Sequence, residues 1–292
     1  MIVGNHLNFL PKNTRKLWET MQSPSFAAWT NGFVLIGGTG ITLHIGHRIS
    51  HDLDLVWAHP LSLGHSLSME SLPRKSLEHL LSTLSVDFGP VEKLVDIKAE
   101  QDFLNDGLEL DDYQQDYLIG GVKVTFFSGP KVIADVLGAE SDIHKPLHVA
   151  TLDQLFQLKC LVVNERQKTR DYFDLYMMIK DHEYDLRSAR STLEKSDVYH
   201  AWDTFCSRMA SLPVSVTDEG YESCIVDISK NVSLENMRDF FEEKIAEIDY
   251  PLRDRAVLHP EQEILPNEEA ATLREQQKTR ASRNLFGDVE DK

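Results

Sequence analysis

The stretch FVLIGGTGITLHIGHRISHDLDLV, residues 33–56, decides the fold of the N-terminal half. It opens with four apolar residues and continues through the pair Gly37-Gly38 into a helix-length segment. A second apolar run follows, and it carries Asp52 and Asp54. The order predicts a strand, a glycine turn, a helix and a second strand, which is the layout of a phosphate and metal site.

The acid pair suits a divalent cation. Two acids at positions i and i+2 of a strand point to the same face, so Asp52 and Asp54 are expected side by side. Adjacent carboxylates repel each other unless a cation lies between them or one is protonated. Mg²⁺ or Mn²⁺ prefers such oxygen ligands, and Mg²⁺ takes one or two carboxylates plus substrate phosphates. Alone, the Asp-Leu-Asp pattern more often marks two solvated acids at a strand edge.

The glycine turn strengthens the metal-site interpretation. Backbone amides of Gly37, Gly38 and Thr39 can approach an anion, and the helix predicted over residues 40–46 would point its positive end there. A tight turn that merely needs glycine is the plainer interpretation. Only one short helix separates this turn from the acids, so both are expected at one edge of a small sheet. Arg48 and Ser50 precede the acids and are placed to orient or neutralise phosphate.

The rest of the chain predicts an α+β protein, with a small mixed-sheet core followed by an α-helical half. Two β-rich runs joined by Gly120-Gly121 predict a hairpin that ends at Phe127. Seven acids and no base fall within residues 100–116, which reads as a solvated loop. We expect an α/β domain over residues 1–150, a helical domain that completes the site over 151–255, and a polar, loosely held tail over 256–292, with a helix across 267–283.

The composition of the chain restricts its expected cellular compartment and its expected binding partners. Three cysteines without paired spacing indicate a reducing, cytoplasmic compartment, and no apolar run approaches the length of a membrane helix. The net charge of −17 argues against a protein that wraps nucleic acid. Residues 1–50 are nevertheless basic, with four bases and one acid, so any contact with RNA is expected to be local.

A second motif follows at a distance. Lys159 and Arg166 lie on one predicted helix, and Lys-Thr-Arg-Asp-Tyr-Phe-Asp-Leu over residues 168–175 opens the next. Together with GGT, GHR-x-S and DLDL in the first stretch, this pattern resembles nucleotidyltransferases with the DNA polymerase β-like fold. More narrowly, it resembles the AbiEii/AbiGii toxin family of type IV toxin–antitoxin and abortive-infection systems.

The resemblance implies roles for these residues. Asp52 and Asp54 would hold the metal, Lys159 would neutralise phosphate charge, and Asp171 would be a polar active-site residue that assists the attacking hydroxyl. Nucleotide binding falls to the turn and the loop before the acids, namely Gly37, Gly38, Thr39, Arg48 and Ser50. Without the first motif, Lys159 would be an ordinary helix lysine and Asp171 an acid that answers the helix dipole.

Three further residues are expected to support the site. Asp174 shares a helix face with Asp171 and is expected to pair with Arg170 or Arg166. Many polymerase β-like enzymes carry a third metal acid on a later strand, but the matching run, residues 122–127, has no carboxylate. Asp171 or an acid from residues 87–116 is a candidate to replace it.

The expected function is Mg²⁺-dependent transfer of a nucleoside monophosphate from a nucleoside triphosphate (NTP) to an acceptor hydroxyl. The resemblance implies RNA ends, including transfer RNA, as acceptors, and it implies a cognate antitoxin; a protein acceptor stays open. Two alternatives remain. One is a non-catalytic binding module on a degenerate transferase fold. The other is a metal phosphohydrolase built on His44, His47 and His51 beside Asp52. That class also needs downstream ligands, for which His144 and His148 are available.

Overall fold

The computed structural model describes residues 6–57, 71–138, 145–196, 199–212 and 232–248. All of them belong to one compact unit, Met1–Ile248. Residues 249–292 form a second unit outside the described residues, so the predicted tail and its helix across 267–283 lie there too. Within the described part of the chain, no helix is both long and apolar enough to cross a bilayer.

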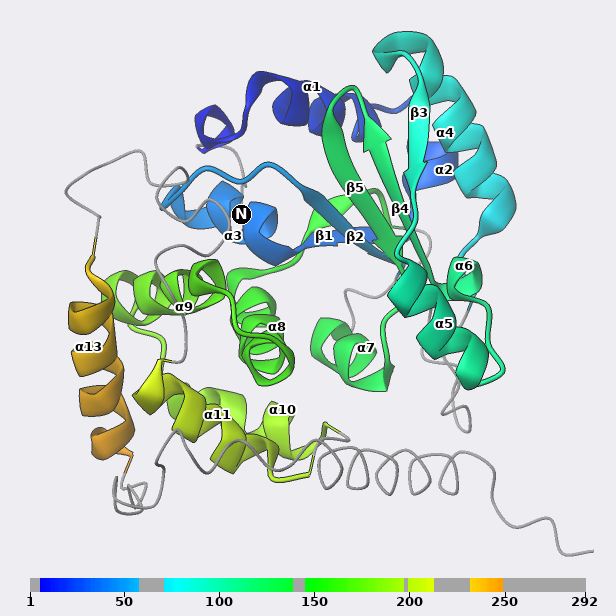
Figure 1. Ribbon diagram of the computed structural model, residues 1–292. Helices are drawn as coiled ribbons and strands as arrows, with labels where there is room; N and C mark the ends of the chain where they lie inside the picture. Colours follow the sequence, from blue (N-terminus) through cyan, green and yellow to red (C-terminus); the bar gives the residue numbers. More distant parts are fainter. Residues whose placement is uncertain (1–5, 58–70, 139–144, 197–198, 213–231, 249–292) are drawn as a thin grey trace, which may run out of the picture. The chain divides into compact units, whose positions relative to one another are not determined.

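Six strands form one mixed sheet in the order β3-β4-β5-β2-β1-β6 (Figure 1). β2 runs antiparallel to β1 and parallel to β5, while β3, β4 and β5 form an antiparallel meander and β6 pairs in parallel with β1. The strands span Phe33–Ile36 (β1), Leu53–Trp57 (β2), Val91–Leu94 (β3), Gln114–Ile119 (β4), Val122–Phe127 (β5) and His148–Val149 (β6). The predicted mixed-sheet core is confirmed.

One face of the sheet is apolar and covered. Helices α1 (Lys12–Met21) and α4 (Arg74–Phe88) pack there, with α2 (Ala27–Thr30) beside α4. Leucines on α4 recur at helical spacing, and alternate residues of the strands meet them, so the period of each element puts its apolar side inward. Alternation sends the intervening residues, which include Asp54 and Thr125, to the opposite face of the sheet.

The acidic run 100–116 is not the loop that its charge suggested. It contains helices α5 (Ile97–Asn105) and α6 (Leu110–Tyr113) and the start of β4. The carboxylate of Asp96 caps α5 by accepting hydrogen bonds from the backbone N–H groups of Lys98 and Ala99. Three of its seven acids are exposed and the other four are half-buried, so water screens part of their mutual repulsion.

The second half of the described chain is helical, as predicted. Its helices are α7 (Lys131–Leu137), α8 (Leu152–Glu165), α9 (Thr169–His182), η3 (Leu186–Ala189), α10 (Arg190–Glu194), α11 (Ala201–Ser211) and α13 (Leu234–Glu247). A capping box between Thr151 and Gln154 starts α8. Helices α8 and α9 pack against α3 (Gly37–Ile45), which joins β1 to β2 (Figure 1). Segments more than a hundred residues apart therefore meet beside the glycine turn.

Candidate active site

The turn between β1 and α3 brings the backbone close to an acid. Gly37 has φ +71°, and a Cβ placed on it would lie 2.3 Å from Oδ2 of Asp54. A Cβ on Gly38 would lie 2.2 Å from Nη2 of Arg48. A side chain at either position would displace the neighbouring acid or guanidinium, and the positive φ of Gly37 additionally favours glycine there. Helix α3 begins at Gly37, earlier than predicted, and its first turn contains all of the GGT motif.

Thr39 and Ser50 fix the position of the acid pair. Both are buried, and their hydroxyl oxygens lie 2.8 Å apart. The Thr39 hydroxyl also donates to the backbone carbonyl of Asp52. These bonds tie the first turn of α3 to the segment that enters β2. The structure therefore places both hydroxyls in positioning contacts, although we expected them to bind nucleotide.

Asp54 lies in an environment that opposes its charge. It sits on β2, opposite Ile36 on β1 and Thr125 on β5, while Asp52 lies just before the strand. Burial raises the pKa of Asp54, and the charge of Asp52 raises it further. Lys159, Arg166 and Lys123 act in the opposite direction. A cation beside both carboxylates would relieve this destabilisation, which is the behaviour of an anionic metal ligand pair.

Two acids of α9 organise the cations behind Asp54. Lys159 Nζ lies 2.8 Å from Asp171 Oδ1 and 2.9 Å from Asp174 Oδ2. All three side chains are almost fully buried. Burial alone would lower the pKa of Lys159, but Asp174 and Asp171 raise it above its usual value, so the amine stays charged. Lys159 therefore delivers a fixed positive charge close to Asp54.

Asp174 also holds the loop after α3. Its Oδ1 accepts from Arg48 Nε at 2.6 Å and its Oδ2 from Nη2 at 3.0 Å. His47 Nε2 lies 2.6 Å from the same Oδ1, and its ring stacks on Phe173. Burial would raise the pKa of Asp174, but Arg48, Lys159 and the bond from His47 hold it well below its usual range. The expected pairing of Asp174 with Arg170 or Arg166 was wrong.

Arg166 pairs with the other acid. Its Nε donates to Asp171 Oδ2 at 2.8 Å and its Nη2 to Oδ1 at 3.2 Å. Burial would raise the pKa of Asp171, but Lys159 and Arg166 lower it below its usual value. The Arg166 side chain is 53% exposed, so part of its guanidinium faces solvent and can reach a ligand. Arg48, in contrast, is buried with Asp174 and ties α3 to α9.

His47 is the contributor that the sequence did not assign to this site. The cluster of histidines had suggested a hydrolase, but these side chains go to different partners. His44 Nε2 lies 2.8 Å from the Ala150 carbonyl, and His148 Nδ1 lies 2.8 Å from the Pro146 carbonyl. His144 lies outside the described residues. Since a buried carboxylate accepts only, His47 must donate to Asp174 through Nε2.

The acid pair fits a metal that substrate phosphates help to hold. In the described ranges, no group of three or more His, Cys, Asp or Glu side chains is arranged to hold an ion. Two carboxylates supply only part of the six ligands that Mg²⁺ takes. In many Mg²⁺ sites the phosphates of a bound nucleotide and water supply the remaining oxygens. Asp52 and Asp54 would hold that ion, and Asp54 is already destabilised as a free anion.

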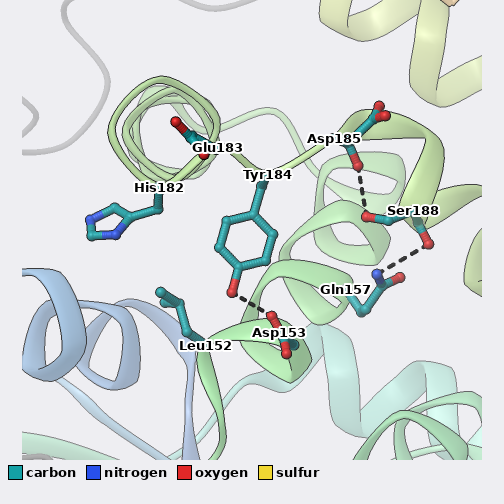
Figure 2. A pocket seen from close by; sticks show the side chains of 8 residues that line it. All are labelled: Leu152, Asp153, Gln157, His182, Glu183, Tyr184, Asp185 and Ser188. Carbon is teal, nitrogen blue, oxygen red and sulfur yellow. Dashed lines mark hydrogen bonds between the residues drawn. The ribbon is translucent and has the colours of Figure 1, made fainter.

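A hollow elsewhere in the described residues does not suit a phosphate. Its volume is about 490 Å³, and it lies between the start of α8 and the segment after α9 (Figure 2). Asp153, Glu183 and Asp185 line it, and the Tyr184 hydroxyl donates to Asp153 at 2.6 Å. An acid-lined hollow repels the anionic tail of a nucleotide. The glycine turn, the acid pair and Lys159 remain the candidate active site.

The fold and this site together define a nucleotidyltransferase. In the mixed sheet, the glycine turn follows the end of β1 and the acid pair lies at the start of β2. Buried Lys159, from the helical half, places a positive charge close to these acids. Residues 20–275 match the family described as "Nucleotidyl transferase AbiEii toxin, Type IV TA system", and the chain belongs to that family. Membership in this family favours nucleotidyl transfer over the metal phosphohydrolase.

Two further proteins are similar to this chain. An uncharacterised protein of Aquifex aeolicus, aq_aa25, is 23% identical over 186 residues, which cover 64% of this chain and 75% of that protein. A crystal structure named "putative nucleotidyltransferase from H. pylori" aligns with a TM-score of 0.38 and 15% identity, over 82% of this chain and 99% of that one. The chain is assigned to its family by the match over residues 20–275 and not by these two similarities.

Proposed function

We propose that the chain transfers a nucleoside monophosphate from an NTP to an acceptor hydroxyl, with Mg²⁺ held by Asp52 and Asp54. The main observation behind this proposal is that the fold brings the motif of residues 37–54 close to the motif that contains Lys159 and Asp171. Lys159, fixed by Asp171 and Asp174, lies close enough to Asp54 to oppose the rise that burial and Asp52 cause in its pKa. Gly37 gives the Asp54 carboxylate room beside the first turn of α3. Nucleotidyl transfer needs this combination of metal ligands, phosphate cradle and fixed cation.

The chain's own residues would divide the work as follows. The N–H groups of the first turn of α3 would receive the phosphates, since a helix N-terminus attracts anions. Lys159 and the exposed part of Arg166 would oppose the negative charge of the triphosphate. Bound Mg²⁺ would supply further charge neutralisation and orient the phosphates. Asp171 would keep both cations aimed at the substrate.

The acceptor and the biological setting are part of the same proposal. Family membership supports a toxin whose activity a cognate antitoxin controls. We propose an RNA end, such as that of transfer RNA, as acceptor, with a protein hydroxyl as the competing candidate. The net charge of −17 restricts RNA contact to a local patch, for which the basic first 50 residues are suited. A cytoplasmic location, where NTPs are available, belongs to the same proposal.

The test is transfer of label from each of the four α-labelled NTPs to total RNA, purified transfer RNA or protein, with and without Mg²⁺. Wild-type protein should label one acceptor class only when Mg²⁺ is present. Asp54→Asn should lower the rate about a hundredfold or more, because it removes the negative charge of a metal ligand without changing side-chain size. Asp102→Asn, the same change at an exposed position of α5, is the matched control. Equal transfer by Asp54→Asn and wild type would contradict the proposal.

A further inference from the structure

One row of side chains crosses the face of the sheet opposite α1 and α4, beside the acid pair. The register sets Asp54 on β2 opposite Thr125 on β5, and Thr125 opposite Asp116 on β4. Residues that are register partners on adjacent strands point to the same face. Adjacent strands lie about 4.8 Å apart, so Thr125 is the immediate neighbour of Asp54 and Asp116 is one strand further away.

Thr125 and Asp116 form a directed pair. The Thr125 hydroxyl donates to Asp116 Oδ1 at 2.5 Å, within the short range that O–H donors reach with carboxylates. The side-chain amide of Gln114 donates to the other oxygen, Oδ2, at 3.1 Å. The proton of Thr125 is thus committed to Asp116, and the lone pairs of Oγ1 are left to accept a hydrogen bond from another hydroxyl.

The geometry of the reaction decides what approaches this pair. In phosphoryl-type transfer, the attacking and leaving oxygens lie roughly in line on opposite sides of the phosphorus. β2 lies between β1 and β5 in the sheet, and α3 follows β1. If the triphosphate occupies the first turn of α3, the leaving pyrophosphate lies on the β1 side of Asp54. The acceptor hydroxyl must then come from the β5 side, over Thr125.

We propose that Thr125 and Asp116 remove the proton of the acceptor hydroxyl, in place of the third carboxylate that β5 lacks. This inference rests on the proposed nucleotidyl transfer. The acceptor oxygen forms a bond to the α-phosphorus, and the bond from that phosphorus to the bridging oxygen breaks. Pyrophosphate leaves with the electron pair. The acceptor proton moves to Thr125 Oγ1 as the Thr125 proton moves to Asp116 Oδ1.

Three variants test this relay. Asp116→Asn keeps an oxygen that can accept from Thr125 but cannot take the proton, and Thr125→Val keeps the shape of the side chain but removes the hydroxyl. Both should lower the single-turnover transfer rate about a hundredfold, the usual lower range for a general base. Thr125→Ser restores a hydroxyl and should stay within about threefold of wild type. Binding of the NTP with Mg²⁺, measured by calorimetry, should be unchanged in all three.

The readouts separate this inference from the proposed function. The inference is overturned if Asp116→Asn or Thr125→Val transfers within about twofold of wild type, or if Thr125→Ser is as slow as Thr125→Val. Loss of NTP binding in the slow variants would also overturn it, since it would indicate a merely structural role. If wild-type protein labels no acceptor at all, the proposed function fails first. If Asp116→Asn does not fold, the comparison of Val with Ser at position 125 still decides.

Discussion

The carboxylate of Asp54 lies where a side chain on Gly37 would begin, 2.3 Å from the position of that missing Cβ. This contact makes the glycine turn and the acid pair one structural unit. The turn needs glycine for its positive φ and also for the space that the acid occupies. A larger residue there would therefore affect catalysis as well as folding.

A comparison of Gly37→Ala with Gly121→Ala should separate the effect of the positive φ from the effect of the space that Asp54 occupies. Gly121 has φ +81° in the hairpin turn, but nothing lies within 4 Å of a Cβ placed there. Both variants should lose about 1–3 kcal/mol of stability from backbone strain. Only Gly37→Ala should also lose about a hundredfold in transfer rate, because it displaces Asp54. Similar transfer rates in the two variants would show that the Asp54 contact has no catalytic importance.

Asp174→Asn should be among the most destabilising changes in the protein. It would remove the charge that Asp174 places beside buried Arg48, and it would take away one of the two carboxylates that pair with Lys159. Breaking a buried ion pair by removing one partner costs about 3–5 kcal/mol. Denaturant unfolding gives the measurement, with Glu194→Gln as control because Glu194 belongs to an exposed pair with Arg190. A loss no larger than that of the control would contradict the role assigned to the buried network.

The same acids predict the response to acid. The pKa values of Asp171 and Asp174 are lowered in the folded protein, so both carboxylates stabilise it above their unfolded pKa of about 3.9. That contribution is lost as the pH falls below about 4 and through the folded values. Unfolding free energy measured from pH 7 downward should drop in wild type and drop less steeply in Asp174→Asn. Parallel curves would refute this explanation.

Asp54→Asn should have the opposite effect on stability. Burial and Asp52 raise the pKa of Asp54, so its charged form destabilises the folded protein at neutral pH. Asparagine removes that charge, and the melting temperature at pH 7 without metal should rise while transfer activity falls. The same substitution type at Asp174 should lower the melting temperature. A fall in both variants would mean that Asp54 is not held under electrostatic strain.

Lys123 is expected to act on the acceptor. It is exposed and lies on β5, two residues before Thr125 and therefore on the same face. Its charge opposes the rise that burial and Asp52 cause in the pKa of Asp54. With an RNA acceptor, Lys123→Gln should raise the acceptor KM severalfold, leave the KM of the NTP unchanged and reduce the slope of log affinity against log salt by about one. An effect on the NTP instead would place the triphosphate on the β5 side.

Much of the site could be predicted because its parts are local in sequence. An apolar run, a glycine pair and Asp-x-Asp need only short-range rules to give β1, the turn, α3 and β2. The Lys159 and Asp171 motif was found by resemblance. What could not be predicted is the partner of Arg48. Next to Ser50 and the acids it looked like a phosphate ligand, whereas folding brings it to Asp174, 126 residues away.

The prediction of a loop over residues 100–116 was also wrong. The acids of residues 100–116 suggested a loop, but a helix depends on capping and on exposure of its charges, and Asp96 supplies the cap. The same run contains Asp116, whose partner Thr125 is nine residues away across the hairpin. Hairpin register decides that contact, and a shift of one residue would have sent Asp116 to the covered face.

The buried network has a consequence for synthesis of the protein. Arg48 and Lys159 acquire their shared counter-ion only when Asp174 and the rest of α9 have left the ribosome and folded. A nascent chain that holds the glycine turn and the acid pair, but not yet α9, would have two unbalanced cations and no fixed geometry around Asp54. Such a chain cannot form the complete candidate site, so we expect nucleotidyl transfer to begin only after α9 has been synthesised and has folded.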